Sequence, residues 1–191
     1  MQIALKEWAV ILNAMKQGLH HILLRKGGLA DKGQTFRVEY PKFFLFPTYE
    51  HQQKEMTQKK HQTLYDQTVK GMSAENKLLI DSWAEVKESF EVKEFSMLKP
   101  LSTLHVWSDS YLQMRLNYKP EKPLYLLLLR IYRLTTPKEI EKLERYGGCR
   151  SWVELDETIS TEGSIPVISD DDFSKVSNSL NNSTISALLP S

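Results

Sequence analysis

Two cations followed by two glycines, Arg25-Lys26-Gly27-Gly28, are the first residues whose types and spacing suggest chemistry. Glycine lets a backbone approach a ligand closely, and backbone N–H groups together with basic side chains can hold one anion. The segment lacks the Gly-x-x-x-x-Gly-Lys-Ser/Thr spacing of a P-loop. It therefore predicts either a phosphate contact or a basic hairpin turn, because glycine pairs also mark turns.

A second polar cluster, Thr48-Tyr49-Glu50-His51-Gln52, follows the apolar run at 43–46. Loops held by rigid strands are common places for binding groups, so Tyr49, His51 and Gln52 are predicted to line a binding pocket. His51 with Glu50 could form a general acid–base pair, but neighbours on a strand point to opposite faces. If a helix begins here, Thr48 would instead be its N-cap.

A metal-dependent nuclease is an alternative reading of the acidic residues. Restriction-type nucleases use a carboxylate and then Glu-x-Lys on the next strand, where the acids bind Mg²⁺ and the lysine activates water. Asp81 followed by Glu91-Val92-Lys93 fits this pattern, and Glu85-Val86-Lys87 offers a second Glu-x-Lys. Such triplets arise readily by chance in a chain with 24 acidic and 25 basic residues.

Other metal and nucleophile chemistry has little support in the residue spacing. His20, His21, His61 and His105 form no Cys/His pair at zinc spacing, so neither a structural zinc nor another cofactor is expected. Cys149 is the only cysteine, and no spacing identifies a base for it. A single cysteine excludes an internal disulfide and favours a reducing, cytoplasmic location.

Composition is that of a globular protein, with 41% hydrophobic and 26% charged residues in a chain of 191. No apolar run reaches the roughly 18 residues of a membrane helix, and the N-terminus does not resemble a signal peptide. The formal net charge of +1 hides a basic body, since residues 1–155 carry +6 and the rest is acidic. A basic body favours an anionic partner, and the acidic tail could compete for the same surface.

Hydrophobic periodicity predicts the elements that must position these residues. Apolar residues at helical spacing predict an amphipathic helix over 4–15. Alternation and short apolar runs predict strands at 21–26, 36–40, 43–46, 78–94, 124–134, 151–155 and, at an edge, 165–168. For 78–94 the Glu and Lys content leaves a helix as the alternative. Residues 21–48 are expected to be antiparallel strands joined by short loops, and 50–75 a polar helix or surface loop.

Helices are expected at 109–117 and, opened by Pro137, at 138–145. The sequence therefore predicts an α+β fold, with a mixed or mostly antiparallel sheet and flanking helices. Residues 1–155 would form a single α+β domain, 156–181 an acidic extension with a short helix capped by Ser169 or Asp170, and 182–191 a disordered tail. Within the strand at 124–134, Arg130 and Arg133 point to opposite faces, and a buried arginine needs an acid or an anionic ligand.

An ordered series of segments resembles a known family. The series comprises Ala4–Trp8, Leu23–Gly28, Leu45–Gln52, His105–Trp107, Leu128–Leu134 and Tyr146–Trp152. Together they are similar to the bacterial, largely cyanobacterial domain of unknown function 1802, over about residues 2–180. The resemblance implies no catalytic residues, but the family's occasional association with a Mrr-type restriction endonuclease domain implies a role in DNA restriction or processing.

A weaker likeness is to the PUA and ASCH class of small barrels that bind RNA or modified bases. It rests on the N-terminal helix, the strand ending in Leu-Arg-Lys and the later strands followed by short helices, and it implies a ligand site at the barrel mouth. The leading hypothesis is thus a nucleic-acid-binding accessory module for DNA or RNA, in which Arg25 and Lys26 contact phosphate. The alternatives are the nuclease and a non-enzymatic protein-interaction module that uses residues 50–75 or the acidic tail.

Overall fold

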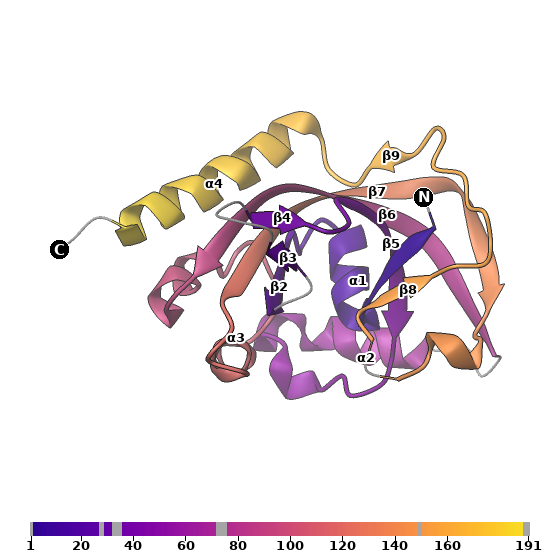
Figure 1. The fold of residues 1–191 in the computed structure, drawn as a ribbon, viewed down its shortest axis with the longest axis horizontal. Helices are drawn as coiled ribbons and strands as arrows, with labels where there is room; N and C mark the ends of the chain where they lie inside the picture. Colours follow the sequence, from indigo (N-terminus) through magenta and orange to yellow (C-terminus); the bar gives the residue numbers. More distant parts are fainter. Residues whose placement is uncertain (1, 27–28, 32–35, 72–75, 149, 189–191) are drawn as a thin grey trace.

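A strongly curved, mixed β-sheet forms the body of the molecule in the computed structural model (Figure 1). The structure describes residues 2–26, 29–31, 36–71, 76–148 and 150–188, and for 29–31, 36–38 and 183–188 it describes the backbone alone. The strands of the sheet are β1 (Ile3–Trp8), β2 (Ile22–Lys26), β5 (Lys42–Thr48), β6 (Lys77–Val92), β7 (Leu124–Glu141), β8 (Trp152–Glu154) and β9 (Ile165–Pro166). The helices are α1 (Ala9–Lys16), α2 (Gln62–Lys70), α3 (Asp109–Asn117) and α4 (Asp170–Leu188).

The strand order is β2-β7-β6-β5-β1-β8, and β9 pairs with β7. β1 and β5 are parallel, whereas the other pairs of this sheet are antiparallel. The predicted α+β class with a mixed sheet is therefore confirmed. Two short strands, β3 (Leu29–Asp31) and β4 (Phe36–Val38), form a separate hairpin.

The sheet curls until its edge strand β2 approaches β1. These strands are four places apart in the order, which in a flat sheet would separate them by about 19 Å. Yet Arg25 on β2 and Glu7 on β1 form an ion pair with 3.2 Å between Nη2 and Oε2. The described strands do not close into a hydrogen-bonded barrel, so the predicted PUA-like barrel is present only as an open, curved sheet.

Helix α1 fills the concave side of this sheet (Figure 1). It is buried nearly all round, because Ala9, Val10, Ile11, Leu12, Ala14 and Met15 are all inside. The strands β1 and β5 are covered on both faces. Leu5 and Leu45 pack in the core around α1, whereas Ala4 and Phe46 pack in a second core that contains Tyr146. Burial on both faces explains why β5 is a continuous apolar run.

The predicted helix over 4–15 is wrong in its first half. Residues Ile3–Trp8 form β1, which pairs with β5 on one side and β8 on the other, and the helix begins only at Ala9. Over so short a stretch, the apolar residues at positions 4, 5 and 8 fit both the helical spacing and the spacing of a strand. Pairing with two distant strands therefore decides the local structure, which short-range propensity cannot reveal.

The helix predicted at 138–145 is also wrong, because β7 continues through Pro137 to Glu141. Its pairing with β6 is interrupted at this point, since Ser82 opposes Arg133 while Ile80 opposes Lys138. Pro137 lies in the extra residues of that irregularity, where no ladder hydrogen bond requires its missing N–H. The proline thus marks a bulge rather than a helix start.

Residues 21–48 do not form one antiparallel unit. β2 pairs with β7, β3 pairs with β4, and β5 lies between β1 and β6. By contrast, the strand expected at 78–94 is confirmed as β6, and the helix at 109–117 is confirmed as α3. The polar segment 50–75 contains two 3-10 turns, η1 (Lys54–Met56) and η2 (Lys59–His61), followed by α2. Asn13 of α1 donates a hydrogen bond to Thr68 of α2, with 2.9 Å between Nδ2 and Oγ1.

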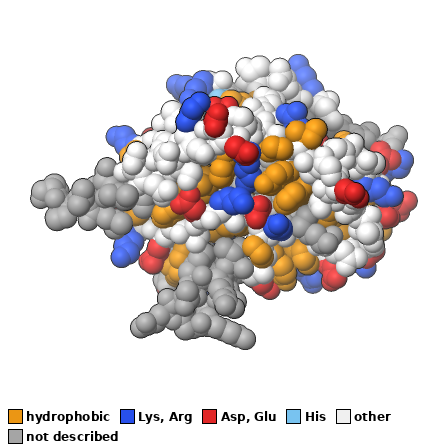
Figure 2. Space-filling model, turned by 90° about the horizontal axis from the view of Figure 1, so that it is seen from above, with side chains coloured by type: hydrophobic (Ala, Val, Ile, Leu, Met, Phe, Trp, Pro, Cys, Tyr) orange, Lys and Arg blue, Asp and Glu red, His pale blue; other side chains and the backbone are white. Residues whose placement is uncertain are grey.

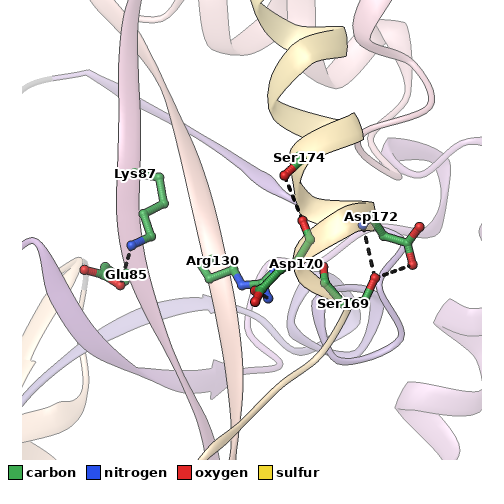
Figure 3. Close-up of polar contacts among 7 residues, drawn as sticks. All are labelled: Glu85, Lys87, Arg130, Ser169, Asp170, Asp172 and Ser174. Carbon is green, nitrogen blue, oxygen red and sulfur yellow. Dashed lines mark hydrogen bonds and ion pairs between the residues drawn. The ribbon is translucent and has the colours of Figure 1, made fainter.

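Helix α4 crosses the convex side of the sheet and is held there by Arg130 (Figures 1 and 3). Arg130 is 3% exposed, and its Nη2 lies 2.6 Å from Oδ1 of Asp170, while Nη1 donates to the carbonyl of Ser169. Its guanidinium also lies 4.7 Å from the ring centre of Phe173. An internal ion pair, the commoner answer for a buried arginine, is thus confirmed. Figure 2 shows this face, where exposed hydrophobic side chains lie beside acidic and basic ones.

The helix is longer than the short one predicted, since it runs to Leu188. Ser169 is its N-cap, as its Oγ accepts a hydrogen bond from the Asp172 N–H at 3.1 Å. Buried Leu180 and the hydrogen bond between Ser177 and Glu88 attach the helix further along its length. The division into a domain, an extension and a disordered tail stays a prediction.

We expect Asp170→Asn to destabilise the attachment of α4 by about 1 kcal/mol. The substitution removes the charge that neutralises a buried arginine, but the Asp170 side chain is 98% exposed, so solvent screens the pair. Amide hydrogen exchange of α4 measures this effect. Asp171→Asn is the matched control, because this neighbour is also an aspartate and has no contact with Arg130 among the interactions of the described chain. Equal exchange in both variants would contradict the prediction.

Candidate nucleic-acid interface

A cavity of about 420 Å³ lies where β1, β2 and β5 end against α3 and against Gly148, Arg150 and Ser151. The curvature of the sheet creates it, by bringing the end of β2 to the end of β1. The parallel strands β1 and β5 deliver their carboxyl ends to the same side. The cavity therefore collects side chains from four elements that are far apart in the sequence.

The cavity is lined by more cationic than acidic side chains. The cations are Lys6, Arg25, Arg115 and Arg150, and the acids are Glu7 and Glu50. Lys6 is held in place by two backbone carbonyls, those of Tyr146 at 2.7 Å and Gly148 at 2.8 Å. Arg150 is exposed at the rim. The surplus of positive charge makes the cavity complementary to an anion.

Arg25 lies in the wall of the cavity, and the described residues supply acceptors for only some of its N–H donors. A guanidinium has five N–H donors, and Nη2 of Arg25 donates to Oε2 of Glu7 at 3.2 Å. Its buried Nε has no acceptor among the described residues. Burial lowers the pKa of Arg25, and the Glu7 carboxylate opposes that shift, so the side chain stays charged at neutral pH.

Arg115 reaches the same cavity from α3. Its Nη2 donates to the carbonyl of Leu24 at 3.3 Å, and its buried Nε also lacks an acceptor within the described part of the chain. Among the described residues, acceptors are therefore present for only a minority of the donors of Arg25 and Arg115. Two arginines with such spare N–H donors beside one cavity can bind an oxygen-rich anion such as a phosphate by donating hydrogen bonds to it.

An aromatic wall faces these cations. Trp8 lies 5.4 Å from Tyr111 between ring centres, and Tyr111 stacks on the buried Trp107 at 5.0 Å and 19°. Burial, aided by the charge of Glu7, raises the pKa of Tyr111. Its hydroxyl therefore stays protonated at neutral pH and can donate a hydrogen bond into the cavity. Flat rings beside arginines can bind a nucleobase as well as a phosphate.

Lys26 does not join this cavity. Its Nζ donates to the carbonyls of Leu116 at 2.5 Å and Lys119 at 3.2 Å, which lie at the end of α3. A cation at this position satisfies helix carbonyls that have no partner inside the helix. The predicted pair of basic residues is thus divided between the cavity wall and the support of α3. Gly27 and Gly28 lie outside the described residues.

The polar cluster at the end of β5 is divided as well. Thr48, Glu50 and His51 line the cavity, and His51 has a left-handed backbone with φ of 61°. Tyr49 instead lines a separate cavity of about 350 Å³, which contains Lys16 and Asp81.

Gln52 turns towards α1, where its Oε1 accepts from the Val10 N–H at 3.4 Å. His51 is therefore the one of the three predicted pocket residues that lies with Arg25. Thr48 does not cap an α-helix, because the next one, α2, begins only at Gln62.

The nuclease site Asp81–Glu91–Lys93 is excluded by geometry. Asp81 and Glu91 belong to the same strand, β6, and ten residues of extended chain span about 30 Å. They cannot share a metal ion. Asp81 instead forms an ion pair with Lys16 at 2.7 Å. In the described residues, no three His, Cys, Asp or Glu side chains lie close enough together to hold a metal.

Sequence reasoning missed several cavity residues. Lys6, Glu7 and Trp8 were hidden by the mistaken helix, and Tyr111 is an ordinary apolar position of α3 by its spacing. Arg115 carried a signal, because an arginine in an otherwise apolar segment needs a partner. Arg150 lies in a segment that also carries the family resemblance, but only the fold brings it to the rim.

The likeness to known proteins concerns both sequence and fold. Among solved structures, ASCH from Zymomonas mobilis is similar at 10% identity and a TM-score of 0.44, covering 81% of this chain and 87% of that one. A serine-to-alanine variant of the same protein has 10% identity and a TM-score of 0.43, covering 81% of this chain and 88% of the variant chain. A tyrosine-to-phenylalanine variant has 12% identity and a TM-score of 0.42, covering 81% of this chain and 90% of the variant chain.

No curated protein matches the chain. No helix of the described residues is long and apolar enough to cross a membrane. The resemblance seen in the ordered segments is confirmed over residues 4–179, and the chain belongs to the family described as domain of unknown function DUF1802.

Proposed function

We propose that this protein binds nucleic acid through the cavity between β1, β2 and α3. The observation that carries the proposal is the pair of arginines, Arg25 and Arg115, whose buried Nε donors have no acceptor among the described residues and which both line one aromatic-walled cavity. The volume of about 420 Å³ falls within the usual range of ligand sites, about 300–1,000 Å³. Phosphate suits the arginines, and a base suits the rings of Trp8 and Tyr111.

A polymer fits the surroundings better than a free nucleotide. Arg150 and Gly148 form an open rim, and the exposed cation Lys119 lies just beyond α3, where it follows Arg115 along the chain. A chain of phosphates can contact such a series of cations successively, which a single nucleotide cannot do. The net charge of +6 over residues 1–155 also favours binding of a polyanion. A link to DNA restriction or processing remains part of the proposal.

Binding is tested with fluorescently labelled DNA and RNA oligonucleotides by anisotropy at several salt concentrations. Arg150→Ala and Arg115→Gln are each expected to weaken binding about tenfold and to reduce the salt slope by about one phosphate contact. Arg25 is tested as the double variant Glu7→Gln with Arg25→Gln, because a single change would leave a buried charge without its partner.

Lys175→Ala is the matched control, since Lys175 is an exposed cation on α4, away from the cavity. It should bind as the unmodified protein does. If all of these proteins bind equally, with one salt slope, the cavity is not the nucleic-acid site. If none binds DNA or RNA, the proposed function is wrong, and a protein-interaction module takes its place.

A further inference from the structure

A stripe of side chains at α3 leads out of the cavity. Tyr111 and Met114, at i and i+3, lie on one face of the helix, and Tyr118, at i+7, is the residue that follows its last turn. Their exposure rises along the stripe, from 7% for Tyr111 through 44% for Met114 to 50% for Tyr118. Tyr111 and Met114 line the cavity, and Tyr118 lies about one helical turn, roughly 5.4 Å, beyond Met114.

Cations surround the outer end of this stripe. The guanidinium of Arg115 lies 5.8 Å from the ring centre of Tyr118, and Nζ of Lys119 lies 5.2 Å from it. Arg115 also lines the cavity, so one side chain connects the two places. A half-exposed tyrosine flanked by cations is the arrangement on which proteins stack the bases of single strands, with the charges following the backbone.

The backbone that carries Tyr118 is anchored. Lys26 donates from β2 to the carbonyls of Leu116 and Lys119, on either side of Tyr118. The Tyr118 N–H donates to the carbonyl of Met114 at 3.0 Å. Anchoring of this kind lowers the conformational entropy that binding would otherwise cost. Lys26 is thereby a positioning residue for the aromatic ring.

We propose that Tyr118 is a stacking platform for a second base, and that the ligand is therefore a single-stranded nucleic acid running along α3. One nucleotide enters the cavity between Arg25 and Tyr111, and the base of the neighbouring nucleotide stacks on Tyr118 in place of the exposed Lys119 ammonium. The exchange is favourable because stacking of a base outweighs an exposed cation–π contact. Bases in a duplex are already stacked and paired, so a duplex cannot use this surface. The inference rests on the proposed function and specifies its ligand.

The test uses the full chain with single-stranded and duplex oligonucleotides that carry one 2-aminopurine, whose fluorescence falls on stacking. We expect preference for the single strand and quenching on binding. Tyr118→Ala should weaken single-strand binding about tenfold and remove the quenching, while Tyr118→Trp should restore both. Tyr118→Leu keeps apolar bulk without a flat aromatic ring and should behave like the alanine variant. Circular dichroism verifies that each variant is folded.

The outcomes separate this inference from the function beneath it. If Arg150→Ala weakens binding while Tyr118→Ala binds single strands as the unmodified protein does, the cavity is supported as the nucleic-acid site and Tyr118 is rejected as a stacking platform. If duplex and single strand bind equally and without quenching, the single-strand assignment is likewise overturned. If neither the unmodified protein nor any variant binds either oligonucleotide, both the proposed function and the role of Tyr118 are wrong.

Discussion

The protein is expected to lose stability as the pH falls from about 6.5 towards 4. His20 is completely buried between β2 and residues 104–107, where its Nδ1 accepts from the Val106 N–H and its Nε2 donates to the Ile22 carbonyl. Burial, followed by the charge of His105, lowers the pKa of His20. Burial also lowers the pKa of His105 to about 4.

The direction of the effect follows from proton uptake. In the unfolded chain both imidazoles have a pKa near 6.5, above their folded values, so below that pH the unfolded state binds more protons. Stability is therefore fully present above about pH 6.5 and decreases as the pH falls to the folded pKa. For His105 alone the loss is about 3 kcal/mol at acidic pH, and His20 adds to it.

Urea unfolding at pH 7.5, 6.0, 5.0 and 4.5 measures this dependence. His105→Gln should flatten the curve, because it removes one of the protons taken up on unfolding. Thr103→Ala is the control, as an exposed residue of the same loop. A stability that stays constant from pH 7.5 to 4.5, or the same slope in the His105→Gln variant, would show that these imidazoles do not govern acid unfolding.

Trp107→Ala is expected to destabilise the fold by about 3–5 kcal/mol, the range for deleting a buried aromatic side chain. Trp107 is 1% exposed and stacks on Tyr111, and its ring lies 4.3 Å from that of His20 at 87°. The cavity left behind would lie under the aromatic wall of the proposed site. Nucleic-acid binding should therefore fall together with stability.

Trp107→Phe should cost much less than Trp107→Ala. The buried Nε1–H of Trp107 has no acceptor among the described residues, so phenylalanine keeps a stacking ring and removes an unpaired donor. Urea unfolding at neutral pH measures both variants. Trp83→Ala is the comparison, because Trp83 is only half-buried where it stacks on Tyr132. A Trp107→Ala variant no less stable than Trp83→Ala would disprove the central role assigned to Trp107.

The sequence predicted two elements at nearly the right bounds. The strand β6 was expected from the apolar residues that restart at Leu78, although its Glu and Lys content also allowed a helix, and α3 was expected from Tyr111, Leu112 and Leu116 at helical spacing. The prediction for β1 was wrong because its six residues fit both a helical and a strand pattern. The predicted β7 was too short because Pro137 suggested the start of a helix. In both cases pairing with distant strands, which periodicity does not encode, decided the outcome.

The candidate site was predictable only in part. Arg25 and His51 carried a local signal, since a basic or polar group at the end of a strand is poised to meet a ligand. Lys26 has the same local signal, yet it supports α3, because adjacent residues of a strand point to opposite sides. Glu7, Tyr111 and Arg150 join Arg25 only through the curvature of the sheet, and no short-range pattern predicts that curvature.

The position of β1 between β5 and β8 has a consequence during protein synthesis. β5 is made soon after β1, but β8, at Trp152–Glu154, is made much later along the chain. At about 5–20 residues per second, one edge of β1 waits on the order of ten seconds for its partner. An unpaired edge is a template for pairing with other chains, so the nascent protein is most prone to aggregation in this interval. Chains that stop before residue 152 would keep that edge open permanently.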